Sequence, residues 1–447
     1  MTAKSQRRKK RQPSRQRGGE PLLPLCAGPD GQVEDVPGLL GLARSGCSFR
    51  VPEEDELIPL PPGADLQLLP ERRALALDPD GRQVELDGLA VAARIPVGYT
   101  RTLLPAFAEP PEGVGYLPFF GYTAVFARGE ELLCAALQTE SNPHWAPQYY
   151  HQPELGPRIS ELKERFPENR ILDQLETCAL EYGCYNAQNI FMHRWEGAVT
   201  VSPACNAQCR GCISLQPEDL PPSPQERFKF KPLVEEIVEL GAHHLASPDA
   251  IFSFGQGCEG EPLLAGDAIA EAVERLAALP DRGSIHLNSN ASLPEKLKKI
   301  VEAGLDSLRV STNSVLPRVY EAYYQPRRYN FEAVRESTRL AGEAGCHLSL
   351  NLLMMPGWTD AAEEVEALVK FVNDYGIDMI QLRTLNIDPN FYAAHVPLPE
   401  GPVIGIPQLL SRLTRECPKL TLGNHSPRVF RRQATGEASS GNEQSRP

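Results

Sequence analysis

The sequence predicts an α/β fold in which a small β-rich N-terminal domain precedes a parallel sheet that curls toward a barrel. Two observations predict this arrangement. The chain has 42 prolines, concentrated before residue 225, and this favours short strands and loops in that half. From about residue 197, strand and helix patterns alternate in six successive units. Consecutive β-α units with right-handed crossovers build a parallel sheet.

Length and composition restrict the class of protein. A chain of 447 residues exceeds one typical core, so we expect two domains with tails. Apolar residues make up 41% and charged residues 23%, which is ordinary for a globular protein. No apolar run is long enough to span a membrane, and no apolar segment follows the basic N-terminus as in a secretory signal. Eleven cysteines without such a signal indicate reduced thiols, metal ligation and a cytoplasmic location.

Charge is distributed unevenly along the chain. The formal net charge is −13, yet residues 1–20 carry eight Lys or Arg and only Glu20, so the remainder is near −20. Such an acidic body is a poor general surface for nucleic acid. The basic tail could contact RNA or an acidic partner, or it could be a disordered solvated arm. We expect residues 433–447, rich in Gly, Ser, Glu and Gln, to be disordered as well.

Residues 21–155 show the patterns of a β-rich domain. Residues 73–77 and 83–86 read as a hairpin around Asp80-Gly81, and residues 116–126 and 131–137 as a second pair around Gly129. Aromatic side chains follow at 144–145 and 149–151. They either line a substrate mouth or pack into a cluster.

Residues 156–194 are predicted to form a helical connector. The imperfect apolar stripe of residues 158–182 predicts one helix, with Cys178 and Cys184 at its end. These two cysteines either hold a second cluster or remain buried free thiols.

The barrel is predicted to span residues 195–390 and to be followed by a helical and strand extension over 391–432. Its strands are expected at 198–201, 251–254, 284–287, 307–311, 347–353 and 377–382, the last strand of the sheet. Helices are expected at 233–240, 269–277, 293–303, 334–342 and 365–372. His243 and His244 follow a helix end, so we expect them in solvent. The chemistry of such barrels lies where the strands end and the loops begin.

The cysteine loop follows the first of these strands. Cys205, Cys209 and Cys212 have the spacing C-x3-C-x2-C. Thiolates are ligands of iron–sulfur clusters and of zinc. Three thiolates on a four-iron cubane leave one iron open, and catalytic metal sites keep an open position. We therefore interpret the loop as a [4Fe–4S] site. Structural zinc with Cys184 or His193 as fourth ligand is the alternative, although zinc sites usually have two C-x2-C pairs and this loop has one.

This motif, placed after the first of six β-α units, resembles that of the radical S-adenosylmethionine (radical SAM) superfamily over about residues 195–390. The motif layout is closest to the molybdenum-cofactor and sulfatase-maturase subgroup. The resemblance implies a partial (β/α)6 TIM-like barrel and a cluster whose open iron binds SAM. It also implies reductive cleavage of SAM to a 5′-deoxyadenosyl radical, and an electron donor of the flavodoxin or ferredoxin type.

The resemblance further implies a set of SAM contacts. Gly260-Glu261-Pro262 resembles the family's G-G-E-P motif and would place Glu261 near the methionine ammonium. Residues 309–314 resemble the ribose-contacting segment, with Ser311 and Asn313 as hydrogen-bonding residues, and residues 351–360, which begin at Asn351, resemble the segment beside the adenine. Arg383 would meet the SAM carboxylate or a substrate anion.

Two residues depart from the family pattern, and one feature of some family members is absent from the sequence. Gly211 stands where an aromatic residue usually precedes the third cysteine, so adenine packing must come from elsewhere. Glu259, preceded by Cys258, replaces the first glycine of G-G-E-P, so the loop has to accommodate a charged side chain. No cysteine-rich segment follows the barrel, so we expect no auxiliary clusters there.

The main hypothesis is thus an enzyme that makes a 5′-deoxyadenosyl radical and abstracts hydrogen from a peptide or protein, an RNA or a cofactor precursor. The alternative is a non-enzymatic iron–sulfur protein that senses redox state or transfers electrons. Formation of 5′-deoxyadenosine from SAM separates the two.

Overall fold

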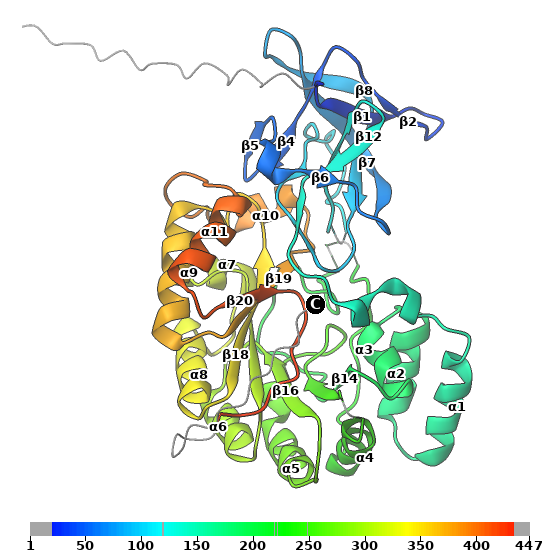
Figure 1. Ribbon diagram of the computed structural model, residues 1–447, viewed down its shortest axis with the longest axis vertical. Helices are drawn as coiled ribbons and strands as arrows, with labels where there is room; N and C mark the ends of the chain where they lie inside the picture. Colours follow the sequence, from blue (N-terminus) through cyan, green and yellow to red (C-terminus); the bar gives the residue numbers. More distant parts are fainter. Residues whose placement is uncertain (1–19, 119, 219, 221, 248, 433–447) are drawn as a thin grey trace, which may run out of the picture.

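The computed structural model describes residues 20–432 except 119, 219, 221 and 248. A β-rich N-terminal region sits above an α/β barrel, and three connector helices flank the barrel on one side (Figure 1). The predicted disordered tails lie outside the described residues, apart from Glu20.

The N-terminal region consists of antiparallel strand pairs, as predicted for a β-rich region. Its main sheet has the order β3-β7-β8-β1-β11-β12-β6, with β2 paired to β1; β10-β4-β5 and β13-β9 form smaller sheets. The strands are β1 (Leu23–Ala27), β2 (Val33–Asp35), β3 (Leu40–Gly41), β4 (Ala43–Ser45), β5 (Ser48–Arg50), β6 (Ile58–Pro59), β7 (Asp65–Leu77), β8 (Gln83–Arg94), β9 (Tyr99–Arg101), β10 (Leu104–Pro105), β11 (Thr123–Arg128), β12 (Glu131–Cys134) and β13 (Ala136–Gln138).

Both hairpins expected from turn residues are present in this region. Strands β7 and β8 pair from Leu77 opposite Gln83, and the Gly81 N–H donates to the Asp78 carbonyl at 2.9 Å to close the turn. Gly81 has φ +78°, a conformation that glycine adopts readily. Strands β11 and β12 pair around Gly129, but β11 begins only at Thr123, so residues 116–122 are not part of it.

The connector contains three helices in place of the single helix predicted over 158–182: α1 (Leu155–Arg165), α2 (Ile171–Leu180) and α3 (Tyr185–Phe191). That prediction was wrong because Pro167 interrupts the pattern. Proline disfavours the helical conformation of the residue before it, and Phe166 has φ −128° and ψ 66°. The apolar stripe is nevertheless real, since Leu162, Ile171 and Leu175 are buried.

The barrel is a seven-stranded parallel sheet with the order β14-β15-β16-β17-β18-β19-β20. Its strands are β14 (Glu196–Val199), β15 (Ile251–Phe254), β16 (Ser284–Ser289), β17 (Ser307–Thr312), β18 (His347–Met354), β19 (Met379–Thr384) and β20 (Thr421–Gly423). Its helices are α4 (Val234–Leu245), α5 (Gly266–Ala277), α6 (Pro294–Glu302), α7 (Pro317–Tyr324), α8 (Phe331–Glu343), α9 (Ala362–Tyr375), α10 (Pro389–His395) and α11 (Ile406–Glu416). Helices α5, α6, α8 and α9 cover its outer face (Figure 1).

The predicted α/β, TIM-like partial barrel is therefore confirmed, with one correction. The strand expected at 377–382 is not the last one, because β20 follows α11 and pairs parallel to β19. Three residues are too few to show a strand pattern in the sequence. Inside the sheet, apolar and polar side chains alternate. In β17, for example, Leu308 and Val310 are buried in the core, whereas Arg309 and Ser311 line a cavity.

The N-terminal region makes close contact with the upper edge of the barrel. The fully buried Arg101 guanidinium donates to the carbonyls of Leu385, at 2.8 Å, and Met354, at 3.4 Å, just after β19 and at the end of β18. The backbones meet at Gly46 and Gly357, where a Cβ on Gly357 would lie 2.0 Å from the Gly46 nitrogen. The two regions therefore share one interface without intervening side chains at this point.

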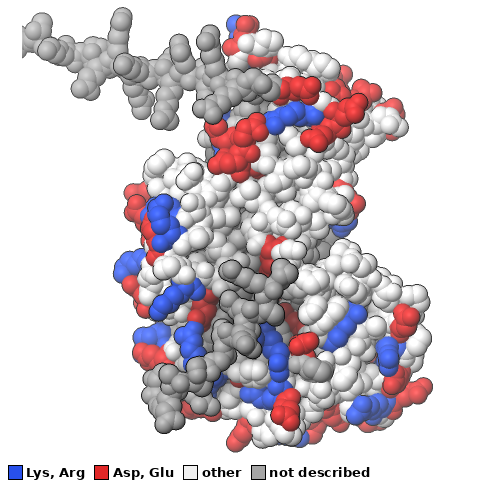
Figure 2. Space-filling model, in the orientation of Figure 1, with Lys and Arg blue, Asp and Glu red and all other residues white. Residues whose placement is uncertain are grey.

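Two further findings concern individual predictions about the surface. His244 is fully buried rather than in solvent, because its ring packs under β14 and accepts a hydrogen bond from the Gly197 N–H at 3.1 Å. Among the described residues, none of the helices has both the length and the apolar character needed to cross a bilayer. Acidic side chains gather at the β-rich end of the face in Figure 2. The exposed acidic residues of the N-terminal region include Glu34, Asp35, Glu53, Glu54, Asp55, Glu130 and Glu131.

Candidate cofactor site

A cavity of about 920 Å³ opens at the carboxyl ends of the barrel strands. The barrel, the cysteine loop, the connector and the N-terminal region all contribute to its lining. The lining includes nine of the ten residues expected from the sequence: Cys205, Cys209, Cys212, Gly260, Glu261, Pro262, Ser311, Asn351 and Arg383. Residues far apart in the chain are thus brought together as the barrel topology requires.

The tenth predicted residue, Asn313, lies outside this lining. It is buried beyond the end of β17, and its side-chain amide donates to the Tyr392 hydroxyl at 3.0 Å. In this position Asn313 fixes helix α10 against the barrel.

Backbone hydrogen bonds attach the cysteine loop to the segment at the end of α7. The N–H groups of Gln208 and Arg210 donate to the carbonyls of Tyr324 and Tyr323, both at 3.0 Å. The Arg327 N–H donates back to the Asn206 carbonyl at 2.8 Å. The loop is therefore held beside the end of α7, with all three of its cysteines in the lining of the cavity.

The three thiols line the same cavity and lie near one another. Burial raises the pKa of Cys209 well above its usual value, and the neighbouring Cys212 and Cys205 raise it further. Burial also raises the pKa of Cys205. Raised pKa values at Cys205 and Cys209 mean that a cationic group favours their thiolate forms, so this donor set suits an iron cluster.

A single metal ion fits the described residues less well than a cluster does. Within residues 20–432, with the gaps noted above, no three His, Cys, Asp or Glu side chains converge closely enough to hold one ion. A cubane distributes its thiolates over three different irons, so its ligands need not converge on a point. The geometry therefore favours the cluster over the zinc alternative.

Arg227 supplies a positive charge beside the third cysteine. Its Nη2 lies 3.3 Å from the Cys212 sulfur, and its Nε donates to the Ser214 hydroxyl at 3.1 Å. A guanidinium at this distance stabilises a thiolate. No sequence motif pointed to Arg227, because it lies fifteen residues beyond Cys212 in an irregular segment.

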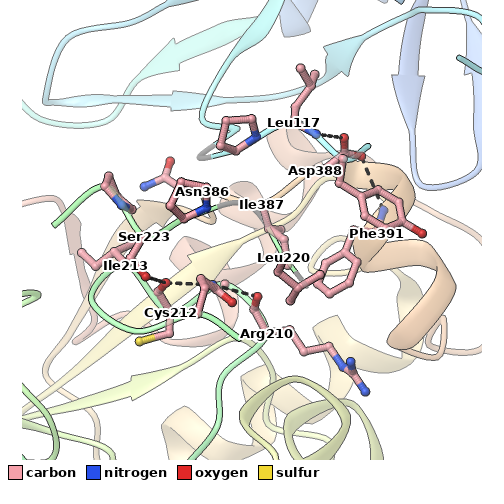
Figure 3. A pocket seen from close by; sticks show the side chains of 16 residues that line it. Leu117, Arg210, Cys212, Ile213, Leu220, Ser223, Asn386, Ile387, Asp388 and Phe391 are labelled. Atoms are coloured by element: carbon pink, nitrogen blue, oxygen red, sulfur yellow. Dashed lines mark hydrogen bonds between the residues drawn. The ribbon is translucent and has the colours of Figure 1, made fainter. Parts of the chain in front are cut away.

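The cysteine loop also forms a wall of a second, smaller pocket, shown in Figure 3. Arg210 and Cys212 contribute to this pocket from the loop, and Leu117, Leu220 and Phe391 face them. Cys212 and Asn386 both line the two pockets, so the pockets adjoin at the loop and at the segment after β19.

The loop between β15 and the following 3₁₀ helix (Pro262–Ala265) carries the Gly-Glu-Pro motif and rests on the cysteine loop. The Gly260 N–H donates to the Ser202 carbonyl at 2.7 Å and the Glu261 N–H to the Ala204 carbonyl at 2.8 Å. A Cβ on Gly260 would lie 1.9 Å from the Ala204 oxygen. Only glycine permits this approach.

Both glutamates of this loop are buried, and each ties the loop to a strand end. The Glu259 carboxylate accepts hydrogen bonds from the N–H groups of Val201, Ser202 and Gln256 at 2.7–2.9 Å. Burial nevertheless raises its pKa to about 8. Glu259 thus bridges the loop to the end of β14, which explains how a charged residue fits where glycine was expected.

Glu261 is held in a similar way. Its carboxylate accepts hydrogen bonds from the Ser289 hydroxyl and from the N–H groups of Asn290, at 2.9 Å, and Leu263, at 3.0 Å. Burial raises the pKa of this carboxyl. Glu261 therefore shapes the cavity wall and keeps the end of β16 beside the motif.

A row of polar side chains crosses three neighbouring strands at the cavity floor. The Ser311 hydroxyl donates to the Asn288 side-chain oxygen at 3.0 Å, and the Asn351 amide donates to Ser311 at 3.4 Å. The Asn351 Oδ1 is buried without a partner among the described residues. Buried polar atoms without partners are rare, and this one lines the cavity, so it is available to a ligand.

Two arginines lie deeper in the same cavity. Arg309 forms a buried ion pair with Glu196, with Nη2 and Oε1 2.7 Å apart. Arg383 donates to the Gln381 side-chain oxygen at 3.1 Å, and burial, with Arg309 nearby, lowers its pKa to about 10. Arg383 is therefore suited to bind an anion.

Aromatic side chains from outside the barrel complete the wall. Trp145 stacks on His425 with ring centroids 4.8 Å apart, and Tyr185 stacks on Tyr150 at 3.5 Å. Trp145, Tyr185 and His425 line the cavity, whereas Tyr150 is buried. These aromatic residues therefore pack against one another and also line the cavity. Both alternatives left open by the sequence, a packed group and a cavity lining, apply.

Sequence reasoning missed the contributions of Tyr323, Arg227, Glu196 and His425. Tyr323 lines the cavity beside Gly211, where an added Cβ would lie 2.9 Å from the Tyr323 hydroxyl. The family usually has an aromatic residue in the cysteine loop at this position. Here an aromatic side chain from α7 lies beside the position instead. The one available signal was the Tyr323-Tyr324 pair at a helix end.

Comparison with known proteins agrees with this geometry. Residues 199–372 match the sequence model of the radical SAM superfamily. The mitochondrial GTP 3′,8-cyclase of Arabidopsis thaliana is 27% identical over 209 residues, which cover 46% of this chain and 50% of that protein. A probable GTP 3′,8-cyclase of Methanosarcina acetivorans is 33% identical over 136 residues, covering 29% and 38%. The chain spans about half or less of the length of these relatives.

Similar solved structures include methylornithine synthase, at 17% identity and a TM-score of 0.35, covering 60% of this chain and 78% of that one. Streptococcus suis SuiB bound to S-adenosylmethionine has 12% identity and a TM-score of 0.36, covering 62% and 67%.

The fold and the cysteine loop define a radical SAM domain. Residues 199–372 match the radical SAM superfamily, and relatives named GTP 3′,8-cyclase align over part of the chain, so the predicted resemblance is confirmed for this domain. The [4Fe–4S] cluster and SAM expected from the sequence are the cofactors of this superfamily.

Proposed function

We propose that this protein is a radical SAM enzyme that cleaves SAM reductively and abstracts a hydrogen atom from a substrate bound in the same cavity. The observation that carries the proposal is the position of three thiols in the wall of a cavity of about 920 Å³. Pockets for one drug-sized ligand measure about 300–1,000 Å³. The cavity lies near the upper end of this range and is therefore large enough to hold SAM.

The chain's own residues have distinct tasks in this proposal. Cys205, Cys209 and Cys212 ligate three irons, and the bound cluster supplies one-electron chemistry. The backbone around Gly260 offers close contact to the methionine end of SAM, and the polar row at Ser311 and Asn351 offers hydrogen bonds to its nucleoside.

Tyr323 and Tyr324 provide the aromatic surface that the cysteine loop lacks at Gly211. Both tyrosines line the cavity, and burial raises the pKa of each well above its usual value, so they stay neutral. Neutral aromatic side chains beside the cluster pack against an adenine ring without adding charge. We assign them this role in place of the missing loop residue.

Among the three substrate classes considered, a cofactor precursor has the most support. The curated relatives are GTP 3′,8-cyclases, whose name describes a nucleotide substrate. In this chain, Arg383 and the stacked Trp145 and His425 give the cavity one site for an anion and one for a planar group.

Reduction of the cluster requires an external electron donor, and a flavodoxin or ferredoxin type suits a one-electron step. An RNA or acidic partner for the basic tail stays a prediction.

The test is anaerobic reconstitution of the full chain with iron and sulfide, followed by reduction and addition of SAM. We expect a [4Fe–4S] signal and release of 5′-deoxyadenosine. Replacing Cys209 by Ala should abolish both, whereas Cys346→Ala, at a buried cysteine outside the cavity, should leave both unchanged. A cluster that forms but never yields 5′-deoxyadenosine would support the alternative of a non-enzymatic iron–sulfur protein.

A further inference from the structure

Two cysteines outside the cluster motif lie in direct contact. Cys178 on α2 and Cys258 in the loop after β15 have their sulfurs 3.5 Å apart, although 80 residues separate them in the chain. Both side chains are buried, with 2% and 5% exposure. The sequence suggested Cys184 as the companion of Cys178, but the fold provides Cys258 instead.

The surroundings of Cys178 favour its ionised form. The Gln174 side-chain amide donates to the Cys178 sulfur at 3.3 Å. Contact with Cys258 lowers the pKa of Cys178, while the same contact raises the pKa of Cys258. A thiolate is the attacking species in thiol–disulfide exchange, and the contact between the two sulfurs places either thiol within reach of the other.

Cys258 belongs to the loop that carries Gly260 and Glu261. Its carbonyl accepts a hydrogen bond from the Phe228 N–H at 2.9 Å, and two residues further on the loop rests on the cysteine loop at Gly260. The backbones are in close contact at Gly260, because the Cβ of any side chain there would overlap the Ala204 carbonyl. A displacement of Cys258 is therefore transmitted to the wall of the cofactor cavity.

We propose that Cys178 and Cys258 form a reversible disulfide that joins connector helix α2 to this loop and weakens SAM binding when it closes. A disulfide has a sulfur–sulfur distance of about 2.05 Å, so the sulfurs need to approach by about 1.5 Å. The two thiols lose two protons and two electrons. A small-molecule disulfide, such as oxidised glutathione, takes up both and is reduced to two thiols through a mixed-disulfide step.

The test uses the full chain with its cluster reconstituted, held anaerobically in buffers of oxidised and reduced glutathione. After acid quenching and alkylation, digestion without reductant should yield a linked peptide pair containing Cys178 and Cys258, with the iron content unchanged. SAM affinity, measured by the change that SAM causes in the electron paramagnetic resonance spectrum of the reduced cluster, should be at least about threefold weaker in the oxidised protein. Incubation with reduced glutathione should restore it.

Matched variants separate the pair from the other thiols. Cys178→Ser and Cys258→Ser should each abolish the linked peptide and the redox dependence of SAM affinity, and Cys346→Ser should abolish neither. The disulfide is scored by mass spectrometry, so it remains testable even if SAM is never cleaved. The proposal is overturned if both cysteines stay alkylated across the glutathione range, if Cys178 links to Cys184, or if the disulfide leaves SAM affinity unchanged.

Discussion

The guanidinium of Arg227 lies 3.3 Å from the sulfur of Cys212, on a segment that no cluster motif includes. The same side chain is held by the Ser214 hydroxyl, which itself donates to the Glu259 carbonyl at 3.3 Å. A fixed positive charge beside a cluster ligand favours the more negative, reduced state of the cluster. Charge and hydrogen bonds to the sulfurs are among the factors that set cluster potentials.

Replacing Arg227 by Gln should therefore lower the midpoint potential of the cluster. We expect a shift on the order of tens of millivolts, where 59 mV corresponds to a tenfold change for one electron. The measurement is a redox titration followed by electron paramagnetic resonance. Arg227→Lys should retain most of the wild-type potential, and Lys229→Gln, at an exposed neighbour, should not change it. Equal potentials for Arg227→Gln and the wild type would contradict the assigned role.

The buried ion pair between Arg309 and Glu196 gives a stability prediction. Arg309→Met leaves the Glu196 carboxylate, about 5% exposed, without its cation. Breaking a buried pair in this way costs about 3–5 kcal/mol of unfolding free energy. The double variant Glu196→Gln/Arg309→Met should recover part of that loss. Chemical unfolding of the three proteins measures it, with the exposed Arg339→Met as control. Similar losses for Arg309→Met and the double variant would argue against an unpaired charge as the cause.

Gly260 permits a sharper test of the loop contact. Gly260→Ala puts a Cβ 1.9 Å from the Ala204 carbonyl oxygen, so the motif loop has to move away from the cysteine loop. We expect a loss of about 1–3 kcal/mol of stability and a marked fall in SAM affinity. Gly156→Ala is the matched control, because a Cβ there meets nothing within 4 Å. Normal SAM binding in Gly260→Ala, measured by equilibrium dialysis, would show that the contact is dispensable.

Glu364 on α9 predicts a pH dependence of stability. Burial raises its pKa from 4.5 to about 7, with the Ser314 hydroxyl and the Val315 N–H, at 2.9 Å, as its partners. The folded state therefore binds this proton more tightly than the unfolded state. Stability should fall as the pH rises from about 4.5 to about 7, by at most about 1.4 kcal/mol per unit.

The measurement compares unfolding midpoints of the wild type and Glu364→Gln across this range. Asp360, whose pKa is raised to about 6 by burial, contributes in the same direction, so the difference between the two proteins isolates Glu364. Glu364→Gln should be less dependent on pH, and the exposed Glu366→Gln should behave as the wild type. Parallel pH profiles for wild type and Glu364→Gln would contradict the prediction.

The sequence predicted the barrel well because its elements repeat a strong local signal. Alternating apolar strands and amphipathic helices identified six strands of the sheet, and the end of each strand identified where polar groups would meet. Cys205, Ser311, Asn351 and Arg383 reach one cavity for that reason. The same reasoning placed Asn313 there, but this residue lies one position beyond the end of β17, and its side chain is buried against α10 instead.

The features that escaped prediction depend on contacts between distant segments. His244 is buried because α4 packs against β14, which its place at a helix end does not reveal. Tyr323 lies beside Gly211 only because α7 is joined to the cysteine loop by backbone hydrogen bonds. Pro167 signals a helix break in the sequence, but the apolar stripe continues on both sides of it and favoured the prediction of a single helix. Local sequence patterns therefore predicted the barrel and most residues of the cavity lining. The other lining residues depend on tertiary packing.

Arg101 has a consequence for any attempt to study the barrel by itself. Its guanidinium comes from the N-terminal region and occupies the carbonyl groups of Met354 and Leu385 at the rim of the barrel. In a fragment that begins at the first barrel strand, those carbonyls would face water, and the roof over β18 and β19 would be missing. Such a fragment would present a wider and more hydrated opening than the intact chain. The ligand affinities measured for such a fragment would therefore differ from those of the intact protein.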